Sequence, residues 1–191
     1  MESLPARRIG TRTEARVLFL TVDVDTFLDT RGIEFERVAV RHPGAVAIVP
    51  VLDDSIILLR QFRAPLRQLL LEIPAGKLDV EGEAPATAAE RECEEEIGYR
   101  PGRLAHLRTI YTTPGFSDER IELYLATDLT EVGSRPDGIE EHHLEIVQLS
   151  FADVRSVMER GEITDAKTLI ALEDVLRMVD PVSGSLLVQE G

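Results

Sequence analysis

The sequence predicts a strand-rich domain with three helices inserted between or after the strands. This layout indicates an α+β domain or a layered α/β/α domain. Short segments rich in β-branched and apolar residues recur along most of the chain, and three segments carry helix start and stop signals. The chain has 191 residues and 43% hydrophobic content, which is enough to bury one sizeable core. No internal repeat or linker rich in Pro, Gly or Ser separates two cores, so we expect one main domain.

Seven segments are predicted as strands because they combine β-branched residues with apolar runs of strand length. They lie at residues 16–22, 33–41, 45–51, 55–62, 103–112, 120–127 and 145–150.

Three helices are predicted from their capping residues. The first covers about residues 84–97, with Pro85 in its first turn and Gly98 as a natural stop. The second covers 151–160, with Ser150 as the N-cap. The third covers 165–178 and follows Thr164.

The overall charge excludes several functions. The formal net charge is −14, so direct attraction to nucleic acid or to an anionic membrane is not expected, and an anionic substrate would need a cation to bridge it. The single Cys93 cannot form an internal disulfide, and no stretch of apolar residues is long enough to span a bilayer. The N-terminus does not resemble a secretion signal, so we expect a cytoplasmic protein.

The first helix is unusually acidic. At about 100° per residue, an ideal helix groups Ala89, Cys93 and Ile97 into one stripe, which we expect to be buried, with Cys93 as a structural thiol. Three glutamates occupy a neighbouring flank; they are Glu92, Glu95 and Glu96. Carboxylates spaced this way destabilise a helix by roughly 0.2 to 0.5 kcal/mol per pair unless a cation neutralises them. Oxygen ligands of this kind suit Mg²⁺ or Mn²⁺, so the three glutamates are predicted metal ligands.

The same segment resembles the Nudix box, G-x5-E-x7-R-E-U-x-E-E-x-G-U, where U is apolar. Gly76 and Glu83 match its first two fixed positions, and residues 91–99 (RECEEEIGY) match the remainder. One departure is that six residues, not five, separate Gly76 from Glu83. The resemblance implies the Nudix α/β/α sandwich with a mixed sheet and the loop-helix motif. It also implies that the Ala75 carbonyl completes the metal site and that Arg91 orients the glutamates.

A wider resemblance to ADP-ribose pyrophosphatases covers about residues 37–178. It includes residues 60–79 (RQFRAPLRQLLLEIPAGKLD) and Pro114, which follows Gly98 by sixteen residues. This resemblance implies Mg²⁺-dependent hydrolysis of ADP-ribose to AMP and ribose 5-phosphate. Two alternatives are hydrolysis of another nucleoside diphosphate sugar and a catalytically silent, nucleotide-binding Nudix domain. The complete glutamate set argues against the silent alternative.

The resemblance also implies roles for residues outside the helix. Arg63, Arg41 and Pro114 are expected to contact the substrate. Glu140 or Glu141 is expected to be the general base, and Glu95 is the next candidate. Members of this group commonly form homodimers in which N-terminal strands reach the partner. We therefore expect such strands in residues 1–41, a Nudix hydrolase domain in 42–180 and a C-terminal tail in 181–191.

Overall fold

The computed structural model describes residues 4–133, 144–180 and 182–187. The chain divides into two compact units, which are treated separately below. The N-terminal unit comprises residues 1–44 and 111–120, and the main unit comprises residues 45–110 and 121–191. The inclusion of 111–120 in the N-terminal unit was not predicted. No helix in the described part of the chain is both long and apolar enough to cross a membrane.

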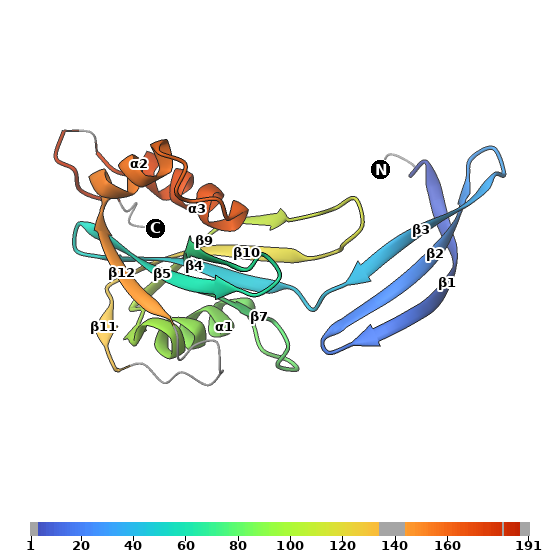
Figure 1. Cartoon of the computed structure of the whole chain (residues 1–191), viewed down its shortest axis with the longest axis horizontal. Helices are drawn as coiled ribbons and strands as arrows, with labels where there is room; N and C mark the ends of the chain where they lie inside the picture. Colours follow the sequence, from blue (N-terminus) through green and yellow to red (C-terminus); the bar gives the residue numbers. More distant parts are fainter. Residues whose placement is uncertain (1–3, 134–143, 181, 188–191) are drawn as a thin grey trace. The chain divides into compact units, whose positions relative to one another are not determined.

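A mixed sheet forms the centre of the main unit (Figure 1). Its strands lie in the order β12-β5-β4-β10-β9, and β6 and β7 pair with β5 and β4. The pair β4 and β10 is parallel, whereas β4 and β5 are antiparallel. The bounds are β4 (Ala45–Leu52), β5 (Ser55–Arg63), β6 (Gln68–Glu72), β7 (Ala75–Lys77), β9 (Arg103–Tyr111), β10 (Arg120–Thr127) and β12 (Glu145–Ser150). A two-stranded sheet pairs β8 (Tyr99–Arg100) with β11 (Thr130–Glu131).

Helices cover both faces of this sheet (Figure 1). On one face lie α2 (Phe151–Glu159) and α3 (Ala166–Arg177), and on the other lie α1 (Pro85–Glu92) and the π-helical segment η1 (Cys93–Ile97). Alternate residues of β4 serve the two cores: Ala47 and Val49 pack with α2 and α3, whereas Val46 and Ile48 pack with α1 and η1. The predicted α+β class with an α/β/α sandwich is therefore confirmed.

The helix caps explain where the helices begin and end. Pro85 occupies the first turn of α1, and Gly98 ends η1 in the left-handed conformation with φ 75°. The Ser150 side chain accepts a hydrogen bond from the Asp153 backbone N–H and caps α2, as predicted. For α3 the cap is Asp165, one residue after the predicted Thr164, because its carboxylate accepts from the Thr168 N–H.

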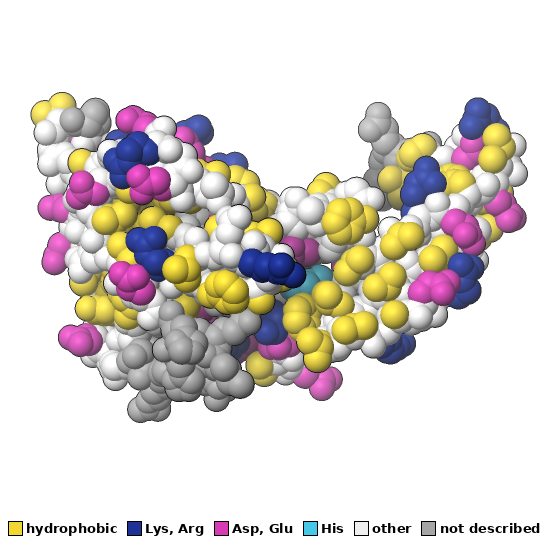
Figure 2. Space-filling view, viewed as in Figure 1, with side chains coloured by type: hydrophobic (Ala, Val, Ile, Leu, Met, Phe, Trp, Pro, Cys, Tyr) yellow, Lys and Arg dark blue, Asp and Glu magenta, His cyan; other side chains and the backbone are white. Residues whose placement is uncertain are grey.

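The N-terminal unit is a three-stranded antiparallel sheet of β1 (Ala6–Val17), β2 (Leu20–Asp29) and β3 (Glu34–Arg41). The predicted strand at 16–22 was wrong, because a tight turn at Leu18, with φ 53°, joins β1 to β2 inside that segment. Apolar side chains are exposed on this unit (Figure 2). On the strands they include Ile9, Val17 and Val38, and in the connecting turns Leu18, Phe19 and Ile33.

Candidate active site

The helix that carries the glutamates is held against the sheet by its apolar stripe. Ala89, Cys93 and Ile97 are all buried, as predicted. Burial raises the pKa of the Cys93 thiol well above its usual range, and nearby glutamate charges raise it further. Cys93 is therefore a buried, protonated packing residue. The helix is not uniform, because its last turn, Cys93–Ile97, is π-helical.

Arg91 is the centre of a largely buried charge cluster on the flank of this helix. Its guanidinium binds both carboxylate oxygens of Glu83, each at 3.1 Å. Its Nη1 also donates to Glu92 at 2.7 Å and to Glu95 at 2.9 Å. These hydrogen bonds, with that to Glu83 the strongest influence, outweigh burial and raise the pKa of Arg91. Arg91 therefore orients the glutamates as predicted, and Glu83 reaches it despite the additional residue in the loop.

The strand β7 lies directly against the two buried glutamates. The Ala75 backbone N–H donates to the Glu96 carboxylate at 2.9 Å. A Cβ atom built on Gly76 would lie 1.8 Å from Oε1 of Glu92, so only glycine leaves room for that carboxylate. The side chains of Glu92 and Glu96 are thereby fixed by the backbone of β7, which itself pairs with the central strand β4.

The donor set fits a hard divalent ion. Glu92, Glu95 and Glu96 present carboxylate oxygens within one turn of helix, and Ala75 brings backbone next to Glu96. Within the described ranges, no group of three or more acidic, histidine or cysteine side chains is arranged so that it could hold a metal ion. Arg91 instead neutralises Glu92 and Glu95. The metal assignment of these four residues therefore remains a prediction.

Replacing Gly76 with alanine tests the close approach of β7 to Glu92. Because the clashing atoms belong to a flexible side chain, we expect the Glu92 carboxylate to move and the paired backbone of β7 to stay in place. Turnover should fall by about 10 to 100-fold, as for other residues that orient metal ligands. Steady-state kinetics and a melting curve in EDTA would check this. Unchanged turnover in a folded Gly76→Ala variant would contradict it.

Arg63 lies at the end of β5, where it pairs with a residue that sequence reasoning missed. Its Nε and Nη2 donate to the buried carboxylate of Glu72 at 2.8 and 2.7 Å. Lys167 on α3 donates to the same carboxylate. Glu72 and Lys167 are far apart in sequence, so only the three-dimensional structure brings them together.

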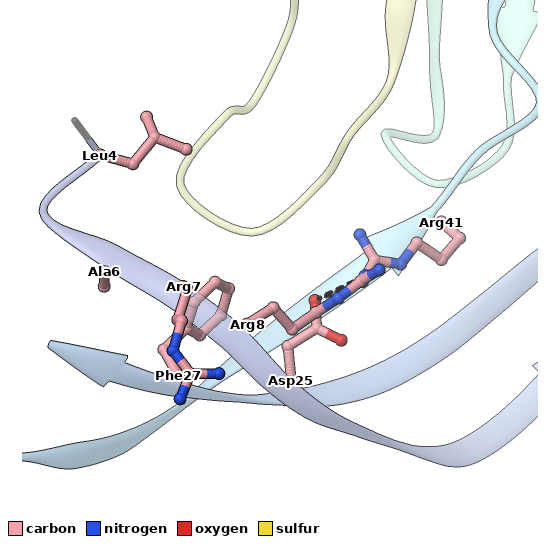
Figure 3. Close-up of a pocket in the computed structure, with 7 residues that line it drawn as sticks. All are labelled: Leu4, Ala6, Arg7, Arg8, Asp25, Phe27 and Arg41. Carbon is pink, nitrogen blue, oxygen red and sulfur yellow. Dashed lines mark hydrogen bonds and ion pairs between the residues drawn. The ribbon is translucent and has the colours of Figure 1, made fainter. Parts of the chain in front are cut away.

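The other predicted substrate residues, Arg41 and Pro114, belong to the N-terminal unit. Arg41 contacts three carboxylates, those of Asp23, Asp25 and Asp118. Arg8 also approaches Asp25, at 3.6 Å, beside a pocket of this unit (Figure 3). Hydrogen bonds from the residue 113–118 turn, which contains Pro114, reach the end of β3 at Val40. The base candidates Glu140 and Glu141 lie outside the described residues.

The helix with its glutamate cluster, the arginine that orients it and the glycine-bearing strand beside it are the parts of a Nudix site. A NUDIX domain model matches residues 41–172. The chain therefore belongs to the Nudix family.

Individual relatives and one solved structure agree with this assignment. An ADP-ribose pyrophosphatase of Bacillus subtilis (strain 168) is 40% identical over 143 residues, covering 74% of this chain and 77% of that protein. A methanol dehydrogenase activator of Bacillus methanolicus is 38% identical over 159 residues, covering 83% and 84%. The crystal structure of an ADP compounds hydrolase superposes with a TM-score of 0.81 at 26% identity, covering 93% of this chain and 96% of that one.

Proposed function

We propose that this chain is a Mg²⁺-dependent Nudix hydrolase that cleaves the pyrophosphate of ADP-ribose with water, giving AMP and ribose 5-phosphate. The observation that carries the proposal is the charge cluster on α1 and η1, where Arg91 holds Glu83, Glu92 and Glu95 while β7 holds Glu96. The choice of ADP-ribose is supported by the relative and the solved structure whose names specify ADP compounds.

Each group in the site has a task in this reaction. A divalent ion, when bound, neutralises phosphate oxygens and lowers the pKa of water, and Glu92, Glu95, Glu96 and the Ala75 carbonyl would hold it. Arg91 offsets the repulsion between the Glu92 and Glu95 carboxylates and orients them. The positively charged guanidinium of Arg63 is proposed to contact the substrate phosphates. Its two hydrogen bonds to Glu72 restrict the conformations of this side chain.

A phosphatase-coupled phosphate-release assay tests the substrate. Both products are phosphomonoesters, so phosphatase releases phosphate from them and not from intact ADP-ribose. We would compare ADP-ribose, other sugar nucleotides, dinucleoside polyphosphates and NADH in the presence of Mg²⁺. The highest kcat/KM on ADP-ribose is the expected result. Turnover of another sugar nucleotide alone would favour the first alternative, and nucleotide binding without turnover would favour the silent domain.

We also propose a homodimer in which the N-terminal sheet contacts the partner chain. Several apolar side chains of this sheet and its turns are exposed, including Val17 at 57% on β1, Val38 at 53% on β3 and Leu18 at 94% in the turn between β1 and β2. Exposed apolar surface of this kind is characteristic of protein interfaces. The stacked pair Phe27 and Phe35 adds aromatic surface to the same sheet.

Deleting residues 1–41 should convert the dimer to a monomer and abolish ADP-ribose hydrolysis. The deletion also removes Val40, which binds the residue 113–118 turn, so a milder change is needed as well. Val38→Lys places a charge on the exposed apolar surface and should weaken dimerisation without removing a strand. Light scattering under turnover conditions measures the oligomeric state, and the phosphate-release assay measures hydrolysis. A fully active monomer would rule out the role of the N-terminal sheet.

A further inference from the structure

A buried network of charges joins the first turn of α3 to the end of β6. The side chain of Glu72, the last residue of β6, is only 1% exposed. It accepts two hydrogen bonds from Arg63 and one from Lys167, and Lys167 also lies 3.0 Å from Asp165. Two cations thus balance two carboxylates inside the main unit, where an unpaired charge would be strongly destabilising.

The same turn of α3 also holds the next residue of the chain. The Ile73 backbone N–H donates to the Thr168 hydroxyl at 3.0 Å, and that hydroxyl donates to Asp165 at 2.6 Å. Asp165 is the N-cap of α3, and Thr168 is fully buried. The cap, the lysine and the threonine therefore form one turn that binds two consecutive residues, Glu72 and Ile73.

These two residues lead directly into the candidate active site. The Pro74 carbonyl accepts from the Ile48 N–H at 2.9 Å, and the Ala75 N–H donates to Glu96 at 2.9 Å. Every residue from Glu72 to Ala75 is therefore tied to a neighbouring element.

The electrostatics link the network to the glutamates as well. Burial acts to raise the pKa of Glu72, but the hydrogen bonds and charges of Arg63 and Lys167 outweigh it, so this pKa is lowered. The hydrogen bonds to Glu72 raise the pKa of Arg63, against the effect of burial, and the charge of Glu96 raises it further. The charge of Arg63 is therefore stabilised both by Glu72 of the network and by Glu96 of the candidate site.

We propose that Lys167 is a positioning residue for the metal-binding glutamates. Together with Arg63 it binds Glu72 and so restrains residues 72–75. The Ala75 N–H at the end of this segment in turn donates to Glu96. Lys167 acts through this backbone and does not touch the reacting groups. The inference rests on the proposed function, in which the glutamates are positioned to bind a divalent ion.

The test replaces Lys167 by methionine, which keeps most of the unbranched apolar side chain and removes its charge. We would measure Mn²⁺ affinity of the substrate-free protein by electron paramagnetic resonance, kcat and KM on ADP-ribose, and thermal unfolding in EDTA. Mn²⁺ affinity and kcat should each fall by about 10 to 100-fold, the usual effect of a partner that orients metal ligands. Lys167→Arg should recover part of both. Arg177→Met, which removes an exposed cation at the other end of α3, is the matched control and should change neither.

A lower melting temperature with parental Mn²⁺ affinity and kcat in the folded Lys167→Met variant would overturn the proposal. If that variant does not fold, Thr168→Val decides by the same measurements, because it removes the hydroxyl that holds Ile73. Weaker Mn²⁺ binding in Thr168→Val supports the positioning role, and parental binding overturns it. If the parent binds Mn²⁺ more tightly than Lys167→Met but neither hydrolyses ADP-ribose, the substrate is wrong and the positioning role stands.

Discussion

Glu96→Gln should lower kcat on ADP-ribose by at least about 100-fold, because a metal ligand should matter more than the partners that orient it, which are worth roughly 10 to 100-fold. Glutamine retains an oxygen that can accept from the Ala75 N–H, so the local hydrogen bond can survive. What the substitution removes is the negative charge that would hold a divalent ion. The loss should therefore appear in turnover and in Mg²⁺ affinity together.

The same variant should be at least as stable as the parent in EDTA. Glu96 is buried and lies four residues after Glu92, which is also buried, so neutralising it reduces like-charge repulsion, worth about 0.2 to 0.5 kcal/mol for a pair at this spacing. Melting curves in EDTA and steady-state kinetics in Mg²⁺ separate the two effects. Glu90→Gln, on the exposed side of the same helix, is the control and should retain parental turnover. Equal activity of Glu96→Gln and the parent would refute the metal assignment.

Removing the general base should lower kcat by about 10² to 10⁴-fold with little change in KM or metal affinity. Once the helix glutamates bind a metal, their basicity falls, so a carboxylate elsewhere is a better proton acceptor for the attacking water. We expect this acceptor to be Glu140 or Glu141, and the other glutamate to matter less.

Kinetics of Glu140→Gln and Glu141→Gln across a Mg²⁺ titration distinguish the two roles. If the substituted residue is the general base, the loss of kcat should persist at saturating Mg²⁺. If added Mg²⁺ restores kcat, the residue contributes to metal binding instead. If both variants keep parental kcat, the base lies elsewhere. Glu95 would then be the next residue to substitute.

Local signals in the sequence predicted most of the main unit. Pro85, Gly98 and Ser150 mark helix ends through contacts within a few residues, so the helices at 85–97 and 151–159 followed from their neighbours alone. The contacts of Arg91 with the box glutamates are also nearly local, which is why the spacing of the motif predicted them.

The features that the sequence did not predict depend on distant residues or lack an apolar pattern. The strand β1 is mostly polar and exposed, so no alternation of burial marks it, and the turn at Leu18 lies within an apolar run. The pairing of Glu72 with Lys167 joins residues 95 positions apart. An ideal α-helical wheel also could not anticipate the π-helical turn, because the wheel assumes α geometry throughout.

The π-helical turn limits how the chain can vary in length. A π turn contains more residues than an α turn, so deleting one residue from Cys93–Ile97 could leave a regular helix that still ends at Gly98. The segment that would change also carries Glu95 and Glu96, whose carboxylates bind Arg91 and the β7 backbone. The loop between Gly76 and Glu83, by contrast, already carries an additional residue while Glu83 still binds Arg91. The loop before the helix thus accommodates one additional residue without loss of the Glu83–Arg91 contact, whereas within the helix the number of residues sets where Glu95 and Glu96 lie.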